Sequence, residues 1–163
     1  MQSEKISVSN LMNPKVQTDF EDQNIRSACN IMYANDIGCV IIVTRARYRS
    51  PVGIITERDV VRVLGKLNPD LLQTPLRMLM SKPLITIEQS ASINEATNIM
   101  NNKKIRRLVV VDRNHKMTGI LTQRDIFKAI DKDPSLFSEF YGKAFSSKFK
   151  EIYERYNKYC LEG

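Results

Sequence analysis

The sequence predicts a mixed α+β protein (α/β-like), in which one β-α-β-β-α unit occurs twice with pseudo-twofold symmetry and a helical extension follows. The first observation is a repeated motif: residues 53–59 read Gly-Ile-Ile-Thr-Glu-Arg-Asp, and residues 119–125 read Gly-Ile-Leu-Thr-Gln-Arg-Asp. The second is that residues before the motifs also recur 68 residues later, as Met12 does in Met80. A repeat of this length favours a closed pair over an open stack of short repeats.

The bulk composition sets broad limits on the chain. Its 163 residues and 42% apolar content suit one compact domain or two small units that share a core. Apolar runs such as 39–43 and 108–111 have the length of strands and are too short to span a bilayer. The first residues carry no apolar signal region, so a cytoplasmic location is the default expectation.

The first unit is expected to occupy residues 7–67. A short turn ends at Pro14, because proline bars further helix, and a strand follows. Asp22 or Asn24 can cap the amphipathic helix that comes next, and Gly65 ends the last helix of the unit. The expected elements are strand 16–18, helix 25–34, strand 39–44, strand 52–55 and helix 57–65.

Residues 68–80 are expected to connect the two units, because this stretch contains two prolines and a short helical patch. The second unit, residues 81–132, repeats the order of the first. Neither unit has enough apolar surface to fold alone, so we expect them to share a core. The expected elements are strand 84–87, helix 93–101, strand 108–112, strand 118–121 and helix 124–130.

The pattern changes in residues 133–163, where aromatic residues recur at helical spacing. This predicts an amphipathic helical extension, broken near Gly142. Two interpretations stay open: the extension covers apolar surface of its own pair or of a dimer mate, or it docks on an effector protein. The apolar residues of this pattern are Phe137, Phe140, Tyr141, Phe145, Phe149, Ile152, Tyr153 and Tyr156.

The few reactive side chains argue against an enzyme. Cys29 and Cys39 lie in apolar patterns and are expected to be small buried residues, and Cys160 has no metal-knuckle spacing with either. The single histidine, His115, falls in an expected turn. No nucleophile stands beside a base, and there is no Walker loop, so we expect no catalytic residues, no metal and no catalytic cofactor.

The net charge of +7 favours anionic partners. Basic residues concentrate at 45–49 and 103–107, so a regulatory protein that binds nucleic acid is an alternative, although no nucleic-acid-binding motif is evident. A structural dimer with vestigial clefts is another alternative.

Each repeated motif places a threonine and an aspartate three residues apart, where a strand is expected to end and a helix to begin. Free backbone N–H groups and the helix dipole near Thr56 and Thr122 favour a phosphate. Asp59 and Asp125 lie one turn into the helices, where a carboxylate suits the hydroxyls of a ribose.

The residue before each aspartate is an arginine, Arg58 or Arg124, which offers forked donors to phosphate oxygens. The Thr-x-x-Asp pattern is also a close relative of the capping box, in which the two side chains bond only to the helix start. Both interpretations stay open, because a cap can fix the backbone that faces a ligand.

These features together resemble the cystathionine-β-synthase (CBS) domain family, specifically a tandem pair of such domains in a stand-alone protein (a Bateman module). The resemblance rests on the β-α-β-β-α order, a methionine and proline before the first strand, the run Ile-Arg-Arg-Leu-Val-Val-Val-Asp at 105–112, and the two Gly-Ile-[Ile/Leu]-Thr-x-Arg-Asp motifs. It covers residues 7–131 and leaves the C-terminal extension outside.

The resemblance implies a regulatory module that binds an adenosine-containing ligand (AMP, ADP, ATP or S-adenosylmethionine) in two clefts between the repeats. It also implies a homodimer. Thr18 and Thr86 would add contacts, and backbone groups of the following strands would receive the adenine edge. The expected ligand-binding residues are Thr18, Gly38, Cys39, Val40, Thr56, Arg58, Asp59, Thr86, Arg106, Arg107, Leu108, Thr122, Arg124 and Asp125.

The two expected clefts differ in charge. Gly38 and Cys39 stand where the second copy has Arg106 and Arg107. A cleft lined by arginines should prefer ligands with more phosphate charge. The first cleft should prefer a ligand with less charge, or an uncharged sulfur nucleoside.

Overall fold

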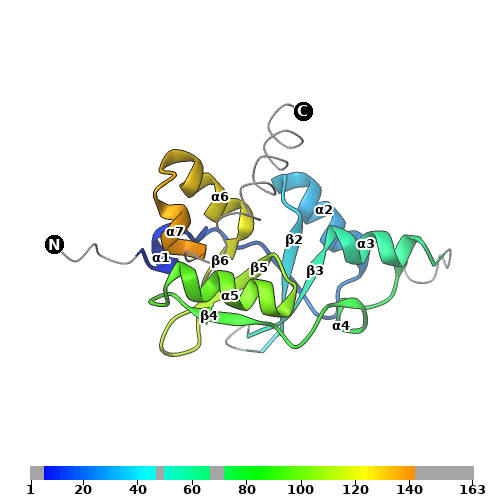
Figure 1. Ribbon diagram of the computed structural model, residues 1–163. Helices are drawn as coiled ribbons and strands as arrows, with labels where there is room; N and C mark the ends of the chain where they lie inside the picture. The colour runs from blue at the N-terminus through cyan, green and yellow to red at the C-terminus, as the bar shows by residue number, and fades with distance from the viewer. Residues whose placement is uncertain (1–5, 47–49, 67–71, 142–163) are drawn as a thin grey trace. The chain divides into compact units, whose positions relative to one another are not determined.

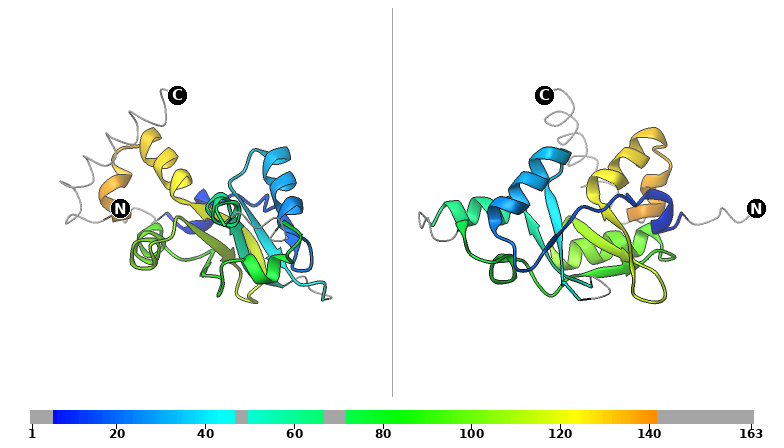
Figure 2. Two further views of the ribbon diagram at one scale, coloured as in Figure 1. Left: turned by 90° about the vertical axis from the view of Figure 1, so that its right-hand side faces the viewer. Right: turned by 180° about the vertical axis from the view of Figure 1, so that it is seen from behind.

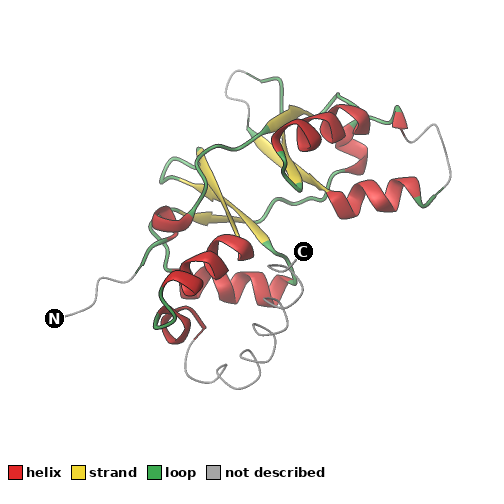
Figure 3. Cartoon of the chain, turned by 90° about the horizontal axis from the view of Figure 1, so that it is seen from above, coloured by secondary structure: helices red, strands yellow, loops and turns green. Residues whose placement is uncertain are grey.

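The computed structural model describes residues 6–46, 50–66 and 72–141. Helices and strands are mixed along the chain (Figures 1 and 3). The chain divides into two compact units that interleave in sequence. Unit 1 comprises Met1–Met12, Gln89–Leu108 and Leu121–Gly163, and unit 2 comprises Asn13–Glu88 and Val109–Ile120.

The β-α-β-β-α order occurs twice, and the mixed α+β fold class is confirmed. A helix of one turn precedes each copy, α1 (Val8–Leu11) or α4 (Leu76–Leu79). The first copy consists of β1 (Thr18–Phe20), α2 (Ile25–Asn35), β2 (Cys39–Val43), β3 (Pro51–Thr56) and α3 (Glu57–Leu64). The second consists of β4 (Thr86–Glu88), α5 (Ile93–Lys103), β5 (Arg107–Val111), β6 (Met117–Thr122) and α6 (Gln123–Lys132).

Each copy contributes a three-stranded sheet, in the order β1-β2-β3 or β4-β5-β6. β1 runs parallel to β2, and β4 runs parallel to β5, because a helix crosses over between the two strands of each pair. β2 and β3 are antiparallel, with Cys39 opposite Thr56. This register brings the end of β3, which carries the repeated threonine, to the start of β2.

The first strand of each copy lies two residues later than the sequence predicts. Strands are expected at 16–18 and 84–87, but they begin at Thr18 and Thr86. β4 ends on Glu88, which hydrophobicity alone does not favour. Pairing with a buried neighbouring strand decides these boundaries.

Helix α1 lies in a stretch for which the sequence predicts only a short turn. Val8 is fully buried, and the Ser7 and Asn10 side chains form a capping box around the helix start. The N–H groups of Val8 and Ser9 donate to the carbonyls of Ala91 and Gln89 in unit 1. A single apolar residue is too weak a sequence pattern to predict a helix, and the backbone hydrogen bonds that hold α1 cannot be read from the sequence.

The core of unit 2 is centred on β2, which is buried on both faces because successive strand residues point to opposite sides. Val40 and Ile42 pack against Ile25, Ala28 and other residues of the α2 side. The alternate residues of β2, in contrast, pack in a second cluster. That cluster consists of Ile41, Val43, Val109, Val111 and Ile120. The continuous apolar run of the sequence reflects this double burial.

The glycine of the first repeated motif is required by a close contact. A Cβ atom added to Gly53 would collide with the side chain of Met80, which follows α4. Ile54 of β3 also forms an isolated bridge with Ser81. The motif therefore brings the chain after α4 next to β3.

The core of unit 1 is formed by α5, α6 and α7 (Leu136–Tyr141). Helix α7 lies beside α5 and α6 (Figure 2), and its Phe140 is fully buried. The Phe140 carbonyl accepts hydrogen bonds from Thr97 Oγ1 at 2.7 Å and from Asn94 Nδ2 at 3.1 Å. A helical C-terminal extension is therefore confirmed as far as Tyr141, and it covers the chain's own helices.

Residues 142–163, with the expected break at Gly142 and the aromatic residues from Phe145 onward, lie outside the described residues. Cys29 and Cys39 are only partly buried, which corrects the expectation of full burial, and Cys160 lies in the undescribed part. His115 is exposed in a turn, as expected. Within the described residues, no helix has the length and apolar character to cross a membrane.

Candidate functional site

Both repeated motifs form the same strand-to-helix turn. Thr56 ends β3 and is the N-cap of α3, and Thr122 ends β6 and is the N-cap of α6. In each turn the threonine and the aspartate three residues later form a capping box. The capping interpretation of the motif is therefore observed in both copies.

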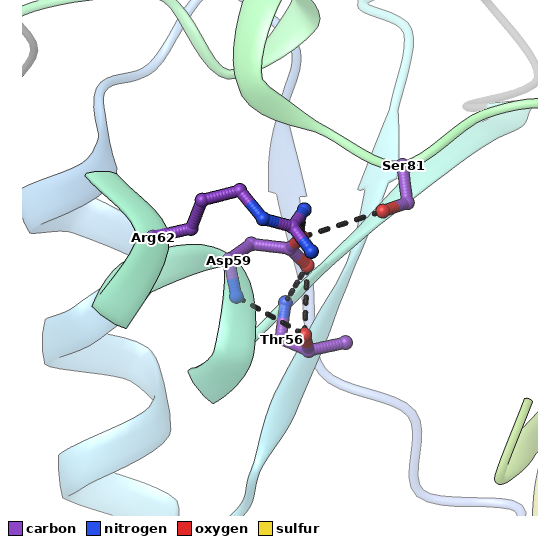
Figure 4. Close-up of polar contacts among 4 residues, drawn as sticks. All are labelled: Thr56, Asp59, Arg62 and Ser81. Atoms are coloured by element: carbon purple, nitrogen blue, oxygen red, sulfur yellow. Dashed lines mark hydrogen bonds and ion pairs between the residues drawn. The ribbon is translucent and has the colours of Figure 1, made fainter. Parts of the chain in front are cut away.

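In the first-copy turn, both oxygens of the Asp59 carboxylate accept hydrogen bonds (Figure 4). Oδ2 accepts from Thr56 N at 2.9 Å and from Thr56 Oγ1 at 2.7 Å. Oδ1 accepts from Arg62 Nη1 at 3.2 Å and from Ser81 Oγ at 3.4 Å. The Asp59 side chain is only 7% exposed, so the protein itself satisfies this carboxylate.

In the second-copy turn, only one oxygen of the corresponding carboxylate has partners. Asp125 Oδ2 accepts from Thr122 N at 2.8 Å and from Thr122 Oγ1 at 2.6 Å. No donor among the residues that the structure describes bonds to Asp125 Oδ1, and Asp125 is partly exposed. This oxygen keeps its capacity to accept a hydrogen bond from a ligand hydroxyl.

The helix starts use most of their backbone N–H groups internally. Asp59 N and Asp125 N donate to the capping threonines at 3.4 Å and 3.3 Å. The N–H groups of the first helical residues, Glu57 and Gln123, donate to the carbonyls that precede β2 and β5. The N–H group of the second helical residue, Arg58 or Arg124, donates no hydrogen bond to an acceptor among the described residues. The phosphate-binding capacity expected from a free helix start is reduced to this one amide and the arginine side chain.

The structure brings three of the expected first-copy residues, Gly38, Cys39 and Val40, next to the Thr56–Asp59 turn. The Gly38 carbonyl accepts the Glu57 N–H at 3.3 Å, and Cys39 lies opposite Thr56 in the sheet. Val40 follows in β2 and is fully buried in the core. Thr18 is further along the sheet, at the start of β1 and opposite Ile41.

The expected second-copy residues show the same local arrangement. The Arg106 carbonyl accepts the Gln123 N–H at 3.0 Å, and Arg107 begins β5. Leu108 is fully buried. These residues and the Thr122 turn belong to unit 1, whereas Thr86 is an exposed residue of β4 in unit 2.

The expected arginines have no acidic partner in the described part of the chain. Arg58, Arg106 and Arg124 are exposed, Arg107 is partly exposed, and none of the four is in an ion pair there. Their guanidinium groups keep their capacity to bind an anion. The described residues contain no group of three or more histidine, cysteine or acidic side chains suited to a metal ion.

Sequence reasoning missed the two residues that occupy Asp59 Oδ1. Arg62 lies three residues after Asp59 on the same helix, a spacing that brings side chains together, so it was within reach of sequence analysis. Ser81 lies 22 residues away, and only the fold brings it there.

Comparisons with known proteins agree with this geometry. The CBS domain family matches residues 8–66 and 76–132. An uncharacterised protein of Methanopyrus kandleri is 46% identical over 100 residues, which are 60% of this chain and 48% of that protein. The chain also matches two uncharacterised proteins of Methanocaldococcus jannaschii, of which it covers 38% and 57% of the length. It therefore covers less than two thirds of each of these three relatives.

Solved structures share the fold. A CBS domain protein from Pyrobaculum aerophilum complexed with AMP has a TM-score of 0.73 at 24% identity, covering 83% of this chain and 98% of that one. The CBS domain pair of protein MJ0100, in complex with 5′-methylthioadenosine and S-adenosyl-L-methionine, has a TM-score of 0.70 at 22% identity, covering 79% and 98%. Because the family matches most of its length, the chain belongs to the CBS domain family and carries two such domains in tandem.

Proposed function

We propose that this chain is a regulatory module that binds an adenosine-containing ligand, such as AMP, ADP, ATP or S-adenosylmethionine, at its Thr-x-x-Asp turns. The observation that carries the proposal is Asp125 Oδ1, which has no donor among the described residues and lies in a capped turn between a strand and a helix. The AMP and S-adenosyl-L-methionine complexes of proteins with the same fold support the ligand class.

The second-copy turn is the principal site in this proposal. Its capping box fixes the carboxylate through Oδ2 and leaves Oδ1 for a ribose hydroxyl. At the first-copy turn, the same ribose would have to displace Arg62 and Ser81 from Asp59. A buried carboxylate that exchanges existing bonds for ligand bonds gains little free energy.

The charges around the second-copy turn favour a phosphate-bearing ligand. Arg124 lies within the turn, and the Arg106 carbonyl, just before Arg107, accepts the N–H of the first residue of α6. None of these three arginines forms an ion pair with an acid among the described residues. The first copy has Gly38 and Cys39 in place of the first two arginines. A second, weaker ligand there would be less charged, such as a sulfur nucleoside.

Regulation follows if the ligand binds one conformation of the module better than another, because binding then shifts the population of conformations. An effector protein, or the partner in a homodimer, would respond to that shift. The role proposed for the chain itself is binding, without a catalytic step.

A thermal-shift screen tests the ligand class. AMP, ATP and S-adenosylmethionine should raise the melting midpoint, and the rise should grow with the logarithm of the ligand concentration above the dissociation constant, whereas GMP should cause no rise. The 2′-deoxy form of AMP should bind less tightly than AMP, since it lacks one hydroxyl for Asp125. No shift with any adenosine compound would instead favour a structural dimer with vestigial clefts.

The nucleic-acid alternative loses one of its arginines to an internal contact. Arg45 Nε bonds to Asp22 Oδ2 at 2.7 Å, and its guanidinium lies 4.2 Å from the centre of the Phe20 ring. Residues 47–49 of the same cluster lie outside the described residues. Binding to DNA or RNA that falls steeply with salt would revive this alternative.

A further inference from the structure

The two copies differ in what covers their helix pairs. In the second copy, α7 packs on α5 and α6 and inserts Phe140, which is completely buried. In the first copy, apolar side chains on α2 and α3 remain exposed: Tyr33 is 92%, Val61 68% and Leu64 55% exposed. An apolar surface of this kind is typical of a contact site.

A pocket of about 160 Å³ lies between α2 and α3. An apolar cavity of about 150 Å³ is large enough to bind a benzene ring, so this pocket has room for one aromatic side chain. Burial in this apolar setting raises the pKa of the Cys29 thiol. The lining residues are Ile25, Arg26, Cys29, Val60, Val63, Leu64 and Leu72, and we call this set the α2/α3 pocket.

The α2/α3 pocket corresponds to the place that Phe140 fills in the second copy. Arg26 and Cys29 stand 68 residues before Asn94 and Thr97, the two residues that bind the Phe140 carbonyl. In the first copy, Leu72 of the connector reaches this pocket. Leucine is smaller than phenylalanine, and Arg26 and Cys29 stand where Asn94 and Thr97 bind the Phe140 carbonyl. Leu72 therefore leaves part of the place empty, and this empty part is the pocket.

The chain supplies further aromatic side chains beyond α7. Phe145, Phe149, Tyr153 and Tyr156 recur at helical spacing in a segment outside the described residues. The corresponding place in the chain's own second copy is already filled by Phe140. Residues 145–156 therefore supply aromatic side chains in addition to Phe140, and the α2/α3 pocket has room for one of them.

We propose that the α2/α3 pocket binds an aromatic side chain from residues 145–156 of a second copy of this chain. Exchange of the segments between two copies would close both open pockets with one self-complementary contact, as a twofold dimer requires. The mode of binding is an amphipathic segment that lays its apolar face in a groove between helices. This proposal does not depend on nucleotide binding.

The oligomeric state of the full-length chain provides the first test. Leu64→Glu places a charge in the pocket at a side chain that is already 55% exposed, so the fold should tolerate it. Sedimentation equilibrium should show a dimer dissociation constant about tenfold higher or more. The matched control is Met78→Glu, because Met78 is 72% exposed and does not line the pocket, and it should leave the dimer unchanged.

A variant of the aromatic segment makes the test specific. Phe149→Glu with Tyr153→Glu should weaken the dimer as much as Leu64→Glu does. Combining all three changes should add little, because they remove two sides of the same contact. Full additivity of the two effects would contradict the proposal, as would a wild-type chain that is monomeric.

Disulfide trapping then identifies which copy supplies the segment. Two forms of the chain, both with Cys39→Ser and Cys160→Ser, are mixed: one keeps Cys29, and the other has Cys29→Ser with Phe145→Cys, Phe149→Cys or Tyr153→Cys in turn. Oxidation should link unlike chains in at least one mixture, because a disulfide requires Cα atoms within about 7 Å. A third form keeps Cys29 and carries the same new cysteine in one chain. Links that form only within single copies of this third form, with no link between unlike chains in any mixture, would overturn the proposal.

Discussion

The first-copy and second-copy turns have the same backbone and differ in how their carboxylates are satisfied. Both threonines cap a helix, and both aspartates bond back to the cap. Asp59 then bonds to Arg62 and Ser81, whereas Asp125 has one oxygen without a donor in the described residues. Duplication therefore preserves the residues that the backbone requires, while the side chains around them diverge.

The helix pairs show the same divergence at a larger scale. Helix α7 covers α5 and α6 through Phe140. At the matching place between α2 and α3, Leu72 lines a pocket that it does not fill. A difference in cover changes the free energy of unfolding most, a difference in hydrogen bonds less, and a difference in surface charge least.

The largest effect is expected at Phe140. Phe140→Ala should lower the free energy of unfolding by about 3–5 kcal/mol, because it leaves a cavity among α5, α6 and α7. Leu72→Ala, at the matching place of the first copy, should cost clearly less, since Leu72 is only partly buried. Urea unfolding of both variants measures the difference. Equal losses would contradict the unequal cover of the two helix pairs.

The next largest effect concerns the two carboxylates. Asp59→Ala removes the partner of Thr56, Ser81 and Arg62 and should cost about 2–3 kcal/mol of stability. Asp125→Ala removes only the bonds to Thr122 and should cost about 1 kcal/mol, as loss of a cap does. The same urea titrations provide the test, with Thr56→Ala and Thr122→Ala as controls for the caps. If Asp125→Ala were the more damaging change, the second-copy carboxylate would have partners that this structure lacks.

A smaller effect is expected for arginine substitutions on nucleotide affinity. Arg107→Ala should weaken ATP binding about tenfold and AMP binding less, because ATP carries more phosphate charge. Arg58→Ala is the matched change beside the first-copy turn and should leave ATP affinity nearly unchanged. Titration calorimetry at a fixed salt concentration measures both. Identical losses for ATP and AMP would show that Arg107 does not contact the additional phosphates.

The smallest effect is expected for Arg45, whose ion pair with Asp22 cannot recur at the corresponding Arg113, because Ser90 stands at the position of Asp22 and has no carboxylate. The hydrogen bond from Arg45 lowers the pKa of Asp22 below its ordinary value. The stabilisation is therefore present above the unfolded-state pKa and is lost as pH falls through the lowered one. Arg45→Ala should lower the melting midpoint slightly at pH 7 and by less near pH 2, where only the contact with the Phe20 ring is lost. A greater loss at the acidic pH would contradict this sign.

The element order and the two turns could be predicted from sequence because they depend on local patterns. Apolar runs mark β2 and β5, Asn24 does cap α2, and Gly65 caps the C-terminus of α3. Helix α1 and the ends of β1 and β4 could not, since single buried residues and pairing with distant strands decide them.

The same distinction applies to the site. The capping box is local, so the Thr-x-x-Asp spacing was enough to predict it. The state of each carboxylate was not predictable, because Ser81 approaches Asp59 only through the fold. Identical motifs in a duplicated sequence therefore give no assurance of identical binding sites.

Calorimetric titration of AMP into the wild-type chain, Asp59→Asn and Asp125→Asn tests the difference between the turns most directly. We predict about one AMP per chain with wild-type affinity in Asp59→Asn, and affinity reduced about tenfold to a hundredfold in Asp125→Asn, because a hydrogen bond to a charged group is lost. AMP binding that survives in Asp125→Asn and disappears in Asp59→Asn would contradict the assignment of the ribose to the second-copy turn.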